Sequence, residues 1–241
     1  MLETLKPADR PKYAAAVRAL DLIEDGMRVG LGTGSTAFWL VEVLAQKVAA
    51  GGFTVTCVPT SSRTRDQAAK AGLRVTTLDD VGWLDLTIDG ADEFDQDLTL
   101  IKGGGGALLQ EKIVATSSDR MVVIADPSKQ VETLGAFPLP VEVVRFGWAV
   151  TEQVIAGLLA DVDVHERAIT RRMDGDAPFV TDEGHYILDL ALGRIASPKP
   201  LALMLNQIPG VVETGLFVDI ADAVIIGQPD GTADFLALEK A

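Results

Sequence analysis

Apolar and polar positions alternate along residues 1–135 in a pattern that predicts strands and helices in turn. Short apolar runs are separated by segments with the 3.6-residue period of an amphipathic helix. Strands joined by helices form a parallel sheet that helices cover on both faces. We therefore expect a Rossmann-like α/β fold with a mostly parallel sheet. The expected strands are 27–31, 53–58, 73–78, 84–88, 98–101 and 121–125, and the expected helices are 12–25, 37–48, a helix capped by Ser61 or Ser62 that ends at Gly72, and 106–116.

The pattern changes after Gly135, where the expected order becomes β-α-β-β-α-β, a ferredoxin-like arrangement. We divide the chain into an α/β catalytic domain, 1–135 with 218–241, and a smaller α+β domain, 136–217. A last strand at 224–226 is expected to return to the edge of the first sheet. The other elements expected here are strands 139–146, 164–171 and 211–217, a hairpin of 179–181 with 186–190, and helices 149–159 and 197–208.

Composition narrows the partners that this chain can have. Its 241 residues carry 35 acidic and 21 basic side chains, a formal net charge of −14. Nucleic-acid binding depends on basic side chains, so we expect no nucleic-acid partner. The first residues lack the apolar core of a signal peptide, and no apolar run reaches the roughly 18 residues of a membrane span. We expect a cytoplasmic protein without a membrane partner.

Cysteine and histidine are too few for several kinds of chemistry. Cys57, the single cysteine, lies in an apolar run and is expected to be a buried thiol. His165 and His185 lie in the second domain, and we interpret both as structural. A catalytic Ser–His pair or a histidine-rich metal site is therefore not expected, and we predict no metal and no cofactor.

A glycine-rich turn, Gly32-Thr-Gly-Ser-Thr36, follows the first expected strand. It fails the dinucleotide pattern G-x-G-x-x-G because Ser35 stands where the last glycine is needed, and no acidic residue ends the next strand. The turn fits a phosphate monoester better, with Ser35 and Thr36 hydroxyls and helix N–H groups as donors. A purely structural turn remains an alternative.

Five carboxylates lie between Asp89 and Asp97. Their spacing does not match an EF-hand loop, although a solvated loop or a divalent-cation site is an alternative. Asp89 directly follows an apolar strand, so it is expected at the carboxyl edge of the sheet, where ligands of open α/β sheets bind. We interpret Asp89 and Asp92 as functional, and Asp95 and Asp97 as surface residues.

Lys102 is followed by four glycines, Gly103–Gly106, between an expected strand and an expected helix. Such a run is entropically costly, and close approach of the backbone to a ligand accounts for it better than a flexible linker does. Glu111 is expected on the same helix face as Leu108. Apolar neighbours raise the pKa of a carboxylate towards the range of a general base, although a surface glutamate is the alternative.

Lysines at two further positions extend the predicted anion site. Lys129 follows another expected strand, and Lys12 is a weaker candidate of the same kind; a solvated lysine is the alternative for Lys129. An acidic protein that nevertheless builds an anion cradle is expected to handle a small phosphorylated or carboxylated metabolite.

Taken together, these motifs resemble the ribose-5-phosphate isomerase type A family, and the resemblance covers nearly the whole chain. The Gly-Thr-Gly turn alone is shared by related sugar-phosphate enzymes, but the combination is specific. The matching segments are Gly32-Thr-Gly-Ser-Thr36, Asp89-Gly-Ala-Asp-Glu93, Lys102-Gly-Gly-Gly105, Glu111-Lys112, Ser128-Lys129, Phe137-Pro-Leu-Pro-Val-Glu142, Ile208-Pro-Gly-Val-Val212 and Gly227-Gln-Pro-Asp-Gly231.

The resemblance implies interconversion of ribose 5-phosphate and ribulose 5-phosphate, in the pentose phosphate pathway, through an enediolate and without a cofactor. It makes Glu111 the base that moves a proton between C1 and C2. Asp89, Asp92 and Lys102 would serve ring opening and the oxygens that gain charge. The implied substrate-binding residues are Thr33, Gly34, Ser35, Thr36, Asp89, Gly90, Ala91, Asp92, Lys102, Gly103, Gly104, Gly105 and Lys129.

Family likeness also implies a homodimer or homotetramer, with the second domain as an oligomer contact. Two departures from the usual family pattern are Gly106, where alanine is common, and Asp182-Glu-Gly-His185, where Asp-Asn-Gly-Asn is common. The alternatives are a sugar-phosphate deaminase, a lactonase, a coenzyme A transferase or a non-catalytic sugar-phosphate sensor. A thioester on Glu111 would favour the transferase, and binding without turnover would favour the sensor.

Overall fold

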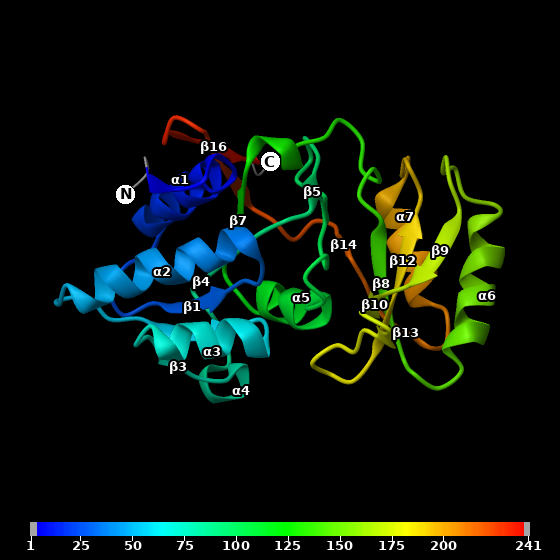
Figure 1. Ribbon diagram of the computed structural model, residues 1–241, viewed down its shortest axis with the longest axis horizontal. Helices are drawn as coiled ribbons and strands as arrows, with labels where there is room; N and C mark the ends of the chain where they lie inside the picture. The colour runs from blue at the N-terminus through cyan, green and yellow to red at the C-terminus, as the bar shows by residue number, and fades with distance from the viewer. Residues whose placement is uncertain (1–3, 239–241) are drawn as a thin grey trace. The chain divides into compact units, whose positions relative to one another are not determined.

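The structure of the protein, a computed structural model, describes residues 4–238 (Figure 1). Its contacts divide the chain into two compact units. The first unit comprises the residues through Ala91, Gln110–Lys129 and the residues from Ile220 onward, and the second comprises Asp92–Leu109 and Gln130–Asp219. The sequence analysis placed 92–109 in the first domain, whereas the contacts group them with the second unit.

A seven-stranded sheet forms the centre of the first unit, in the order β16-β15-β7-β4-β1-β2-β3. All neighbouring pairs are parallel except β15 with β16, which are antiparallel. The predicted parallel sheet is therefore confirmed. The strands are β1 (Arg28–Leu31), β2 (Thr56–Pro59), β3 (Arg74–Val75), β4 (Leu86–Asp89), β7 (Met121–Ala125), β15 (Ala223–Gly227) and β16 (Ala233–Ala237).

Helices pack on both faces of this sheet. Residues of α1, α2 and α3 share one buried apolar cluster with the strands, and Val114 of α5 belongs to another, with Val58 and Leu84. Strand side chains alternate between the faces: Cys57 lies in the first cluster and Val58 in the second. Burial raises the pKa of the Cys57 thiol to about 12, as expected for an inert thiol. The helices are α1 (Arg10–Ala19), α2 (Ser35–Ala49), α3 (Ser62–Lys70), α4 (Leu78–Val81) and α5 (Leu108–Thr116), with 3₁₀ turns η2 (Pro7–Asp9), η3 (Leu20–Leu22) and η4 (Pro127–Lys129).

The second unit contains a four-stranded antiparallel sheet in the order β13-β8-β12-β9. Two helices follow β8 and β12 along the chain, so the predicted β-α-β-β-α-β order is present. Ile155 and Leu201, from the two helices, share one buried cluster with the strands. The elements are β8 (Leu139–Val143), α6 (Trp148–Leu159), β9 (Ala168–Arg171), β12 (Tyr186–Ala191), α7 (Pro198–Asn206) and β13 (Val211–Thr214).

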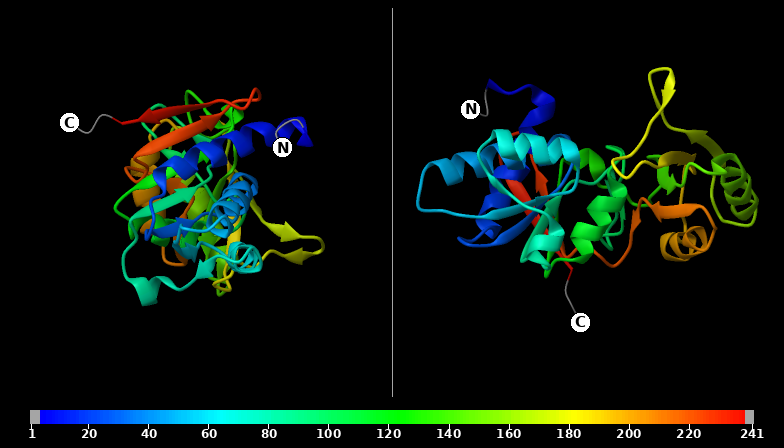
Figure 2. Two further views of the ribbon diagram at one scale, coloured as in Figure 1. Left: turned by 90° about the vertical axis from the view of Figure 1, so that its left-hand side faces the viewer. Right: turned by 90° about the horizontal axis from the view of Figure 1, so that it is seen from below.

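Two smaller sheets complete the second unit. One has three antiparallel strands in the order β14-β6-β5, and the other is the hairpin of β10 and β11, which stands out from the unit in yellow in Figure 2. The first of these sheets explains why residues 92–109 group with the second unit. The strands are β5 (Glu93–Phe94), β6 (Leu100–Ile101), β10 (Met173–Asp174), β11 (Ala177–Pro178) and β14 (Leu216–Phe217).

Several expected elements differ in the structure. The strand expected at the sheet edge, β15, lies one place inside it, because β16 covers its outer side. The strand expected over 211–217 is divided into β13 and β14 at Gly215, where an added Cβ would lie 2.3 Å from the Lys102 carbonyl oxygen. Residues 179–181 form no strand, and the hairpin instead lies just before them.

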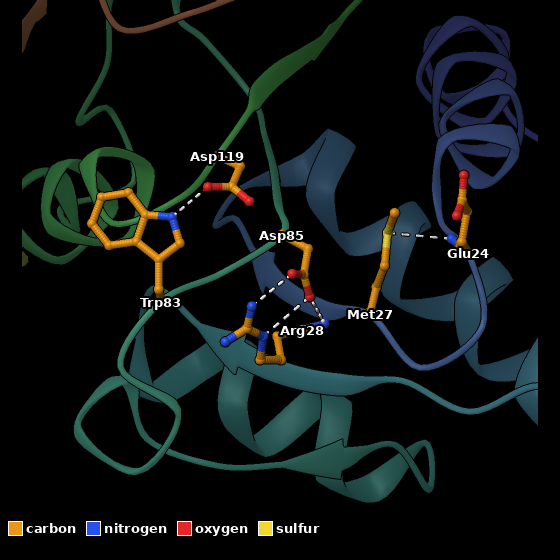
Figure 3. A network of polar contacts seen from close by, with 6 residues as sticks. All are labelled: Glu24, Met27, Arg28, Trp83, Asp85 and Asp119. Carbon is orange, nitrogen blue, oxygen red and sulfur yellow. Dashed lines mark hydrogen bonds and ion pairs between the residues drawn. The ribbon is translucent and has the colours of Figure 1, made fainter.

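Polar contacts tie the ends of β1 and β4 together on the side of the first unit shown in Figure 3. Arg28 donates from Nη2 to Asp85 Oδ1 at 2.7 Å and from Nε to Oδ2 at 3.1 Å. This side-chain hydrogen bonding by Arg28 lowers the pKa of the Asp85 carboxyl. The indole of Trp83 donates to Asp119 Oδ1 at 2.7 Å, and the backbone N–H of Glu24 contacts the Met27 sulfur at 3.3 Å. The Arg28–Asp85 and Trp83–Asp119 pairs fix the start of β4, whose other end carries Asp89.

Within residues 4–238, no helix has both the length and the apolar character that crossing a membrane requires.

Candidate active site

Polar loops follow four neighbouring parallel strands of the first unit, β7, β4, β1 and β2. Parallel strands bring their carboxyl ends to one edge of a sheet, which is where open α/β sheets bind ligands. The loops begin at Gly32, Thr60, Gly90 and Asp126. The sheet therefore gathers, within one unit, the segments that the sequence analysis singled out at strand ends.

Asp89 ends β4 and is fully buried. Its Oδ1 accepts hydrogen bonds from the backbone N–H of Thr33 at 3.0 Å and of Gly90 at 2.7 Å. An added Cβ at Gly32 would lie 2.0 Å from the same oxygen. The glycine at position 32 is thus required by the close approach of Asp89, and the carboxylate holds the loops after β1 and β4 in register.

The Thr33 side chain is part of a buried cluster of hydroxyl groups. Its Oγ1 lies 2.8 Å from Thr60 Oγ1, 2.7 Å from Ser61 Oγ and 3.1 Å from Thr64 Oγ1. Thr64 also donates to the Gly32 carbonyl oxygen at 3.1 Å, and Ser61 caps α3 by accepting from the Thr64 N–H. These bonds fix the glycine-rich turn against the start of α3. Sequence reasoning missed this cluster, because it joins hydroxyls from different loops.

The turn ends at the N-terminus of α2. Gly34 is the N-cap residue, with φ of +123°, and no side chain caps the helix there. Ser35 is exposed, whereas Thr36 is buried. A helix N-terminus without a side-chain cap offers backbone N–H groups and a partial positive charge to an anion. The turn therefore has backbone donors of the kind that a phosphate site needs, and the phosphate site itself stays a prediction.

Glu111 and Lys129 also belong to the first unit. Glu111 lies in the first turn of α5 and is only 2% exposed, so the surface alternative for this glutamate is excluded. Lys129 ends η4, directly after β7, and is partly exposed. Its loop is shaped by Asp126, whose carboxylate accepts from the Ser128 N–H at 3.0 Å and from the Ser128 hydroxyl.

Asp92 and Lys102 lie in the second unit. The backbone N–H of Asp92 donates to the Ile101 carbonyl at 2.8 Å, and that of Lys102 donates to the Gly215 carbonyl at 2.9 Å. The Lys102 side chain is 2% exposed, with Nζ 5.4 Å from the centre of the Phe217 ring. Lys102 is thus a buried cation of the second unit.

The chain passes between the units at Ala91–Asp92 and again at Leu109–Gln110. Along the sequence, Asp89 comes before the first of these crossings and Asp92 comes directly after it. Glu111 is the second residue after the other crossing. The candidate residues fall into two sets, one in each unit. The first unit holds Thr33, Gly34, Ser35, Thr36, Asp89, Gly90, Ala91, Glu111 and Lys129, and the second holds Asp92, Lys102, Gly103, Gly104 and Gly105.

The glycines after Lys102 approach other parts of the second unit closely. An added Cβ at Gly104 would lie 2.6 Å from Asp92 Oδ1, and one at Gly106 would lie 2.3 Å from Phe179 Cζ. Gly103 has φ of +103° and would meet Leu108 at 3.0 Å. The sequence analysis attributed all four glycines to the approach of a ligand. The protein's own packing already requires three of them.

Backbone N–H groups of this loop have different partners. Gly104 donates to Asp92 Oδ2 at 2.7 Å, and Gly106 donates to the Gly103 carbonyl at 3.0 Å. Within residues 4–238, the N–H groups of Gly103 and Gly105 donate to no acceptor of the protein. These two groups can donate to an anionic oxygen of a ligand.

Other carboxylates of the acidic stretch shape the backbone. Glu93 is buried and accepts from the N–H groups of Gly135 at 2.7 Å and Phe137 at 2.6 Å. Asp95 accepts from the N–H groups of Asp97 and Thr99, and its partial burial raises the pKa of its carboxyl. Among residues 4–238, no three side chains of His, Cys, Asp and Glu lie close enough together to hold a metal ion.

His185 contacts a buried carboxylate in the second unit. Its Nδ1 lies 2.9 Å from Glu142 Oε1, which also accepts from the Thr181 hydroxyl at 2.9 Å. Burial of Glu142 raises the pKa of its carboxyl, and the bonds from His185 and Thr181 oppose that rise. These contacts join β8 to the turn before β12, which suits the structural role expected for His185.

The chain is similar to known proteins along most of its length. The family model of ribose 5-phosphate isomerase A (phosphoriboisomerase A) matches residues 56–231. Ribose-5-phosphate isomerase A of Ruegeria sp. (strain TM1040) is 61% identical over 230 residues, which cover 95% of this chain and 88% of the relative. The enzyme of that name from Dinoroseobacter shibae is 62% identical over 230 residues, with the same coverage.

Solved structures agree with the sequence relatives. The ribose 5-phosphate isomerase from Plasmodium falciparum has a TM-score of 0.89 and 34% identity, and the match covers 98% of this chain and all of that one (100%). A D-ribose-5-phosphate isomerase in complex with phospho-erythronic acid has a TM-score of 0.88 and 36% identity, with 97% and 100% covered. Fold and sequence therefore lead to the same group of proteins.

Proposed function

This chain belongs to the ribose 5-phosphate isomerase A family of isomerases, and on that premise we propose that it interconverts D-ribose 5-phosphate and D-ribulose 5-phosphate through an enediolate, with Glu111 as the base. The observation that carries the proposal is the family match, because relatives about 61% identical span 95% of the chain. The matched family segment includes Asp89, Asp92, Lys102 and Glu111.

Aldose–ketose isomerisation requires one base that can reach two adjacent carbons. In the proposed reaction Glu111 removes the proton from C2, and the electron pair forms the C1=C2 bond while the carbonyl oxygen at C1 becomes an oxyanion. The C2 hydroxyl proton then passes to the O1 oxyanion as the C2 carbonyl forms, and Glu111 returns its proton to C1. The burial of Glu111 supports this role, because a desolvated carboxylate is a stronger base than a solvated one.

The oxygen that gains charge needs donors fixed in advance. We assign this role to the Lys102 ammonium and to the N–H groups of Gly103 and Gly105. The buried position of Lys102 supports the assignment, since a donor in a water-poor environment stabilises a developing charge more strongly than one in water. Preorganised donors also cost no reorganisation at the moment of reaction.

Asp89 and Asp92 are assigned to ring opening. Opening the cyclic sugar requires one group to take the proton of the O1 hydroxyl and another to give a proton to the ring oxygen, and carboxyl groups suit both transfers. Each carboxylate is held by a backbone N–H, from Thr33 and Gly90 for Asp89 and from Gly104 for Asp92. These bonds orient the carboxylates towards fixed positions.

The phosphate is assigned to the N-terminus of α2 and to Lys129. Gly34, Ser35 and Thr36 supply backbone N–H groups and hydroxyls, and Lys129 supplies charge. The relative solved with phospho-erythronic acid binds a phosphorylated sugar acid, which supports a phosphorylated ligand here. A phosphate remote from the reacting carbons provides binding energy that orients the substrate.

The proposed reaction is tested by adding the purified protein to ribose 5-phosphate and following ketose formation, with a chelator present throughout. We expect ketose to form at the same rate with and without the chelator. If the chelator abolished activity and Mg²⁺ restored it, the carboxylates between Asp89 and Asp97 would again be a candidate cation site. Binding without turnover would contradict the proposal and favour a sugar-phosphate sensor.

The assigned phosphate site predicts strong discrimination against free ribose. Hydrogen bonds to charged groups contribute about 1.5–3 kcal/mol each, so the loss of two of them lowers kcat/KM by roughly 10²-fold or more. Steady-state kinetics with ribose and ribose 5-phosphate measure the ratio. Equal kcat/KM values for the two sugars would contradict the assigned phosphate site.

The cellular context belongs to the same proposal. We expect the protein to act in the cytoplasm, in the pentose phosphate pathway, as a homodimer or homotetramer. Support comes from the family alone, because the structure describes one chain. Sedimentation of the purified protein measures the assembly directly.

A further inference from the structure

Arg172 lies directly after β9 and contacts the glycine loop of the second unit. Its Nη1 donates to the Gly103 carbonyl at 2.8 Å and to the Gly104 carbonyl at 3.3 Å. The other side of the guanidinium bonds the Asp189 carboxylate, through Nε at 2.9 Å and through Nη2 at 2.5 Å. One side chain therefore joins β12 to the loop after Lys102.

Both ends of this bridge are held by the fold. Asp189 lies on β12, between β8 and β9, where its register neighbours are Pro140 and Thr170. The backbone of Arg172 is also bonded, donating to the Ile187 carbonyl at 2.8 Å and accepting from the Phe179 N–H at 3.0 Å. Its side chain is only 15% exposed. The bidentate pair with Asp189 leaves the guanidinium little freedom to turn.

The peptide group that Arg172 holds is the one that contacts Asp92. The Gly103 carbonyl accepts from Arg172, and the N–H of the same peptide, that of Gly104, donates to Asp92 Oδ2 at 2.7 Å. A peptide group is planar and rigid, so fixing its carbonyl also fixes the direction of its N–H. A cation on the carbonyl polarises the group and strengthens its N–H as a donor.

The Gly103–Gly104 peptide needs a contact from outside the loop to keep one orientation. Gly103 and Gly104 have no side chains, and glycine populates many backbone conformations, so this peptide could rotate unless something outside the loop held it. Phe179, on the segment after the hairpin, limits the loop at a second point, because its ring fills the space in which a Cβ of Gly106 would stand. The segment from Arg172 to Phe179 thus holds the loop from one side.

We propose that Arg172 is a positioning residue of the isomerase reaction, acting on Asp92 through the Gly103–Gly104 peptide, with Asp189 as its anchor. The inference rests on the role in ring opening that the proposed function gives to Asp92. Arg172 itself touches no reacting atom in this account. Its loss lets the peptide rotate and the Asp92 carboxylate move away from its productive position.

The expected effect is a loss in kcat. Displacement of a reacting group by about 1 Å costs up to about 10²-fold, so Arg172→Gln is expected to lower kcat by about 10–10²-fold. KM should change far less, because the phosphate site lies elsewhere in the chain. Arg172→Lys should lower kcat less than Arg172→Gln does but should not restore it fully. A single ammonium cannot reproduce the geometry in which the guanidinium donates to a carboxylate and to two carbonyl oxygens.

A double-mutant cycle with Asp92→Asn separates positioning from general structural support. Arg172→Gln is made in the wild-type chain and in the Asp92→Asn chain, and kcat is measured for all four proteins. If Arg172 acts through Asp92, its replacement lowers kcat by less than about 3-fold once Asp92 is altered. An equal loss in both backgrounds would overturn the inference while leaving the proposed function intact.

Two controls complete the design. Arg171→Gln alters the neighbouring arginine, whose guanidinium lies 4.1 Å from the Trp148 ring centre, so kcat should stay unchanged. Arg172→Lys repeats the cycle if Arg172→Gln fails to fold. Full activity in Asp92→Asn alone would instead refute the role of Asp92, and the inference with it.

Discussion

Glu111→Gln abolishes most of the turnover while the protein stays folded. Glutamine has the size and shape of glutamate but cannot accept a proton from carbon, and a positioned base contributes about 10²–10⁴-fold. We expect kcat to fall by that factor, with a small change in KM, because Glu111 acts on C1 and C2 and not on the phosphate. Stopped assays with ribose 5-phosphate at high enzyme concentration measure the residual rate.

The control for this prediction is Glu152→Gln, the same chemical change on another helix, α6. It should leave kcat within about 2-fold of the wild type, as expected of a substitution outside the site. Thermal unfolding midpoints of both variants show whether the fold is intact. A folded Glu111→Gln protein with the wild-type rate would remove Glu111 from the mechanism.

Lys102→Met is expected to have the next largest effect. Methionine keeps much of the length of lysine and suits a side chain that is only 2% exposed, but it has no charge to offer the oxyanion. Removal of one oxyanion donor costs about 10²–10³-fold in kcat, so we expect a loss in that range. Thermal unfolding of the variant shows whether the loss of kcat occurs in a folded protein.

Lys199→Met serves as the matched control, since Lys199 lies on α7 of the same unit with a side chain that is 66% exposed. Its pair with Asp219 is a surface ion pair, and such pairs contribute about 0–1 kcal/mol. We expect no change in kcat for this variant. If Lys102→Met retained the wild-type kcat, the charge on the oxyanion would have to be stabilised by the glycine N–H groups alone.

Local pattern was sufficient for most elements of the first unit. Strand β7 (Met121–Ala125), for example, is a fully apolar run, and Ser61 is a typical N-cap residue at the start of a helix. The expectation that β15 lies at the sheet edge was wrong, because the sequence pattern of its outer neighbour β16 is weak. Strand β16 (Ala233–Ala237) is short and largely exposed, and its place depends on pairing with β15. The break at Gly215 depends on the Lys102 backbone, which no local pattern reveals.

Some features of the candidate site could likewise be predicted from the sequence, and others could not. The order of strands and loops was enough to place Asp89 at the carboxyl edge of the sheet, and helical spacing was enough to indicate a buried Glu111. The partner of the Gly103 carbonyl was not predictable, because Arg172 is 69 residues further along the chain. Polar contacts between distant segments depend on the completed fold, whereas burial follows largely from periodicity.

The central claim, that Glu111 moves a proton between C1 and C2, is tested most directly by running the reaction in D₂O. A carboxyl base exchanges its proton with solvent between steps, so ketose made by the wild-type protein should accumulate deuterium at C1, and Glu111→Gln should form almost no labelled ketose. Mass spectrometry and NMR of the recovered sugar measure the label. Ketose that remained free of deuterium after many turnovers would indicate direct hydride transfer between the carbons and contradict the account.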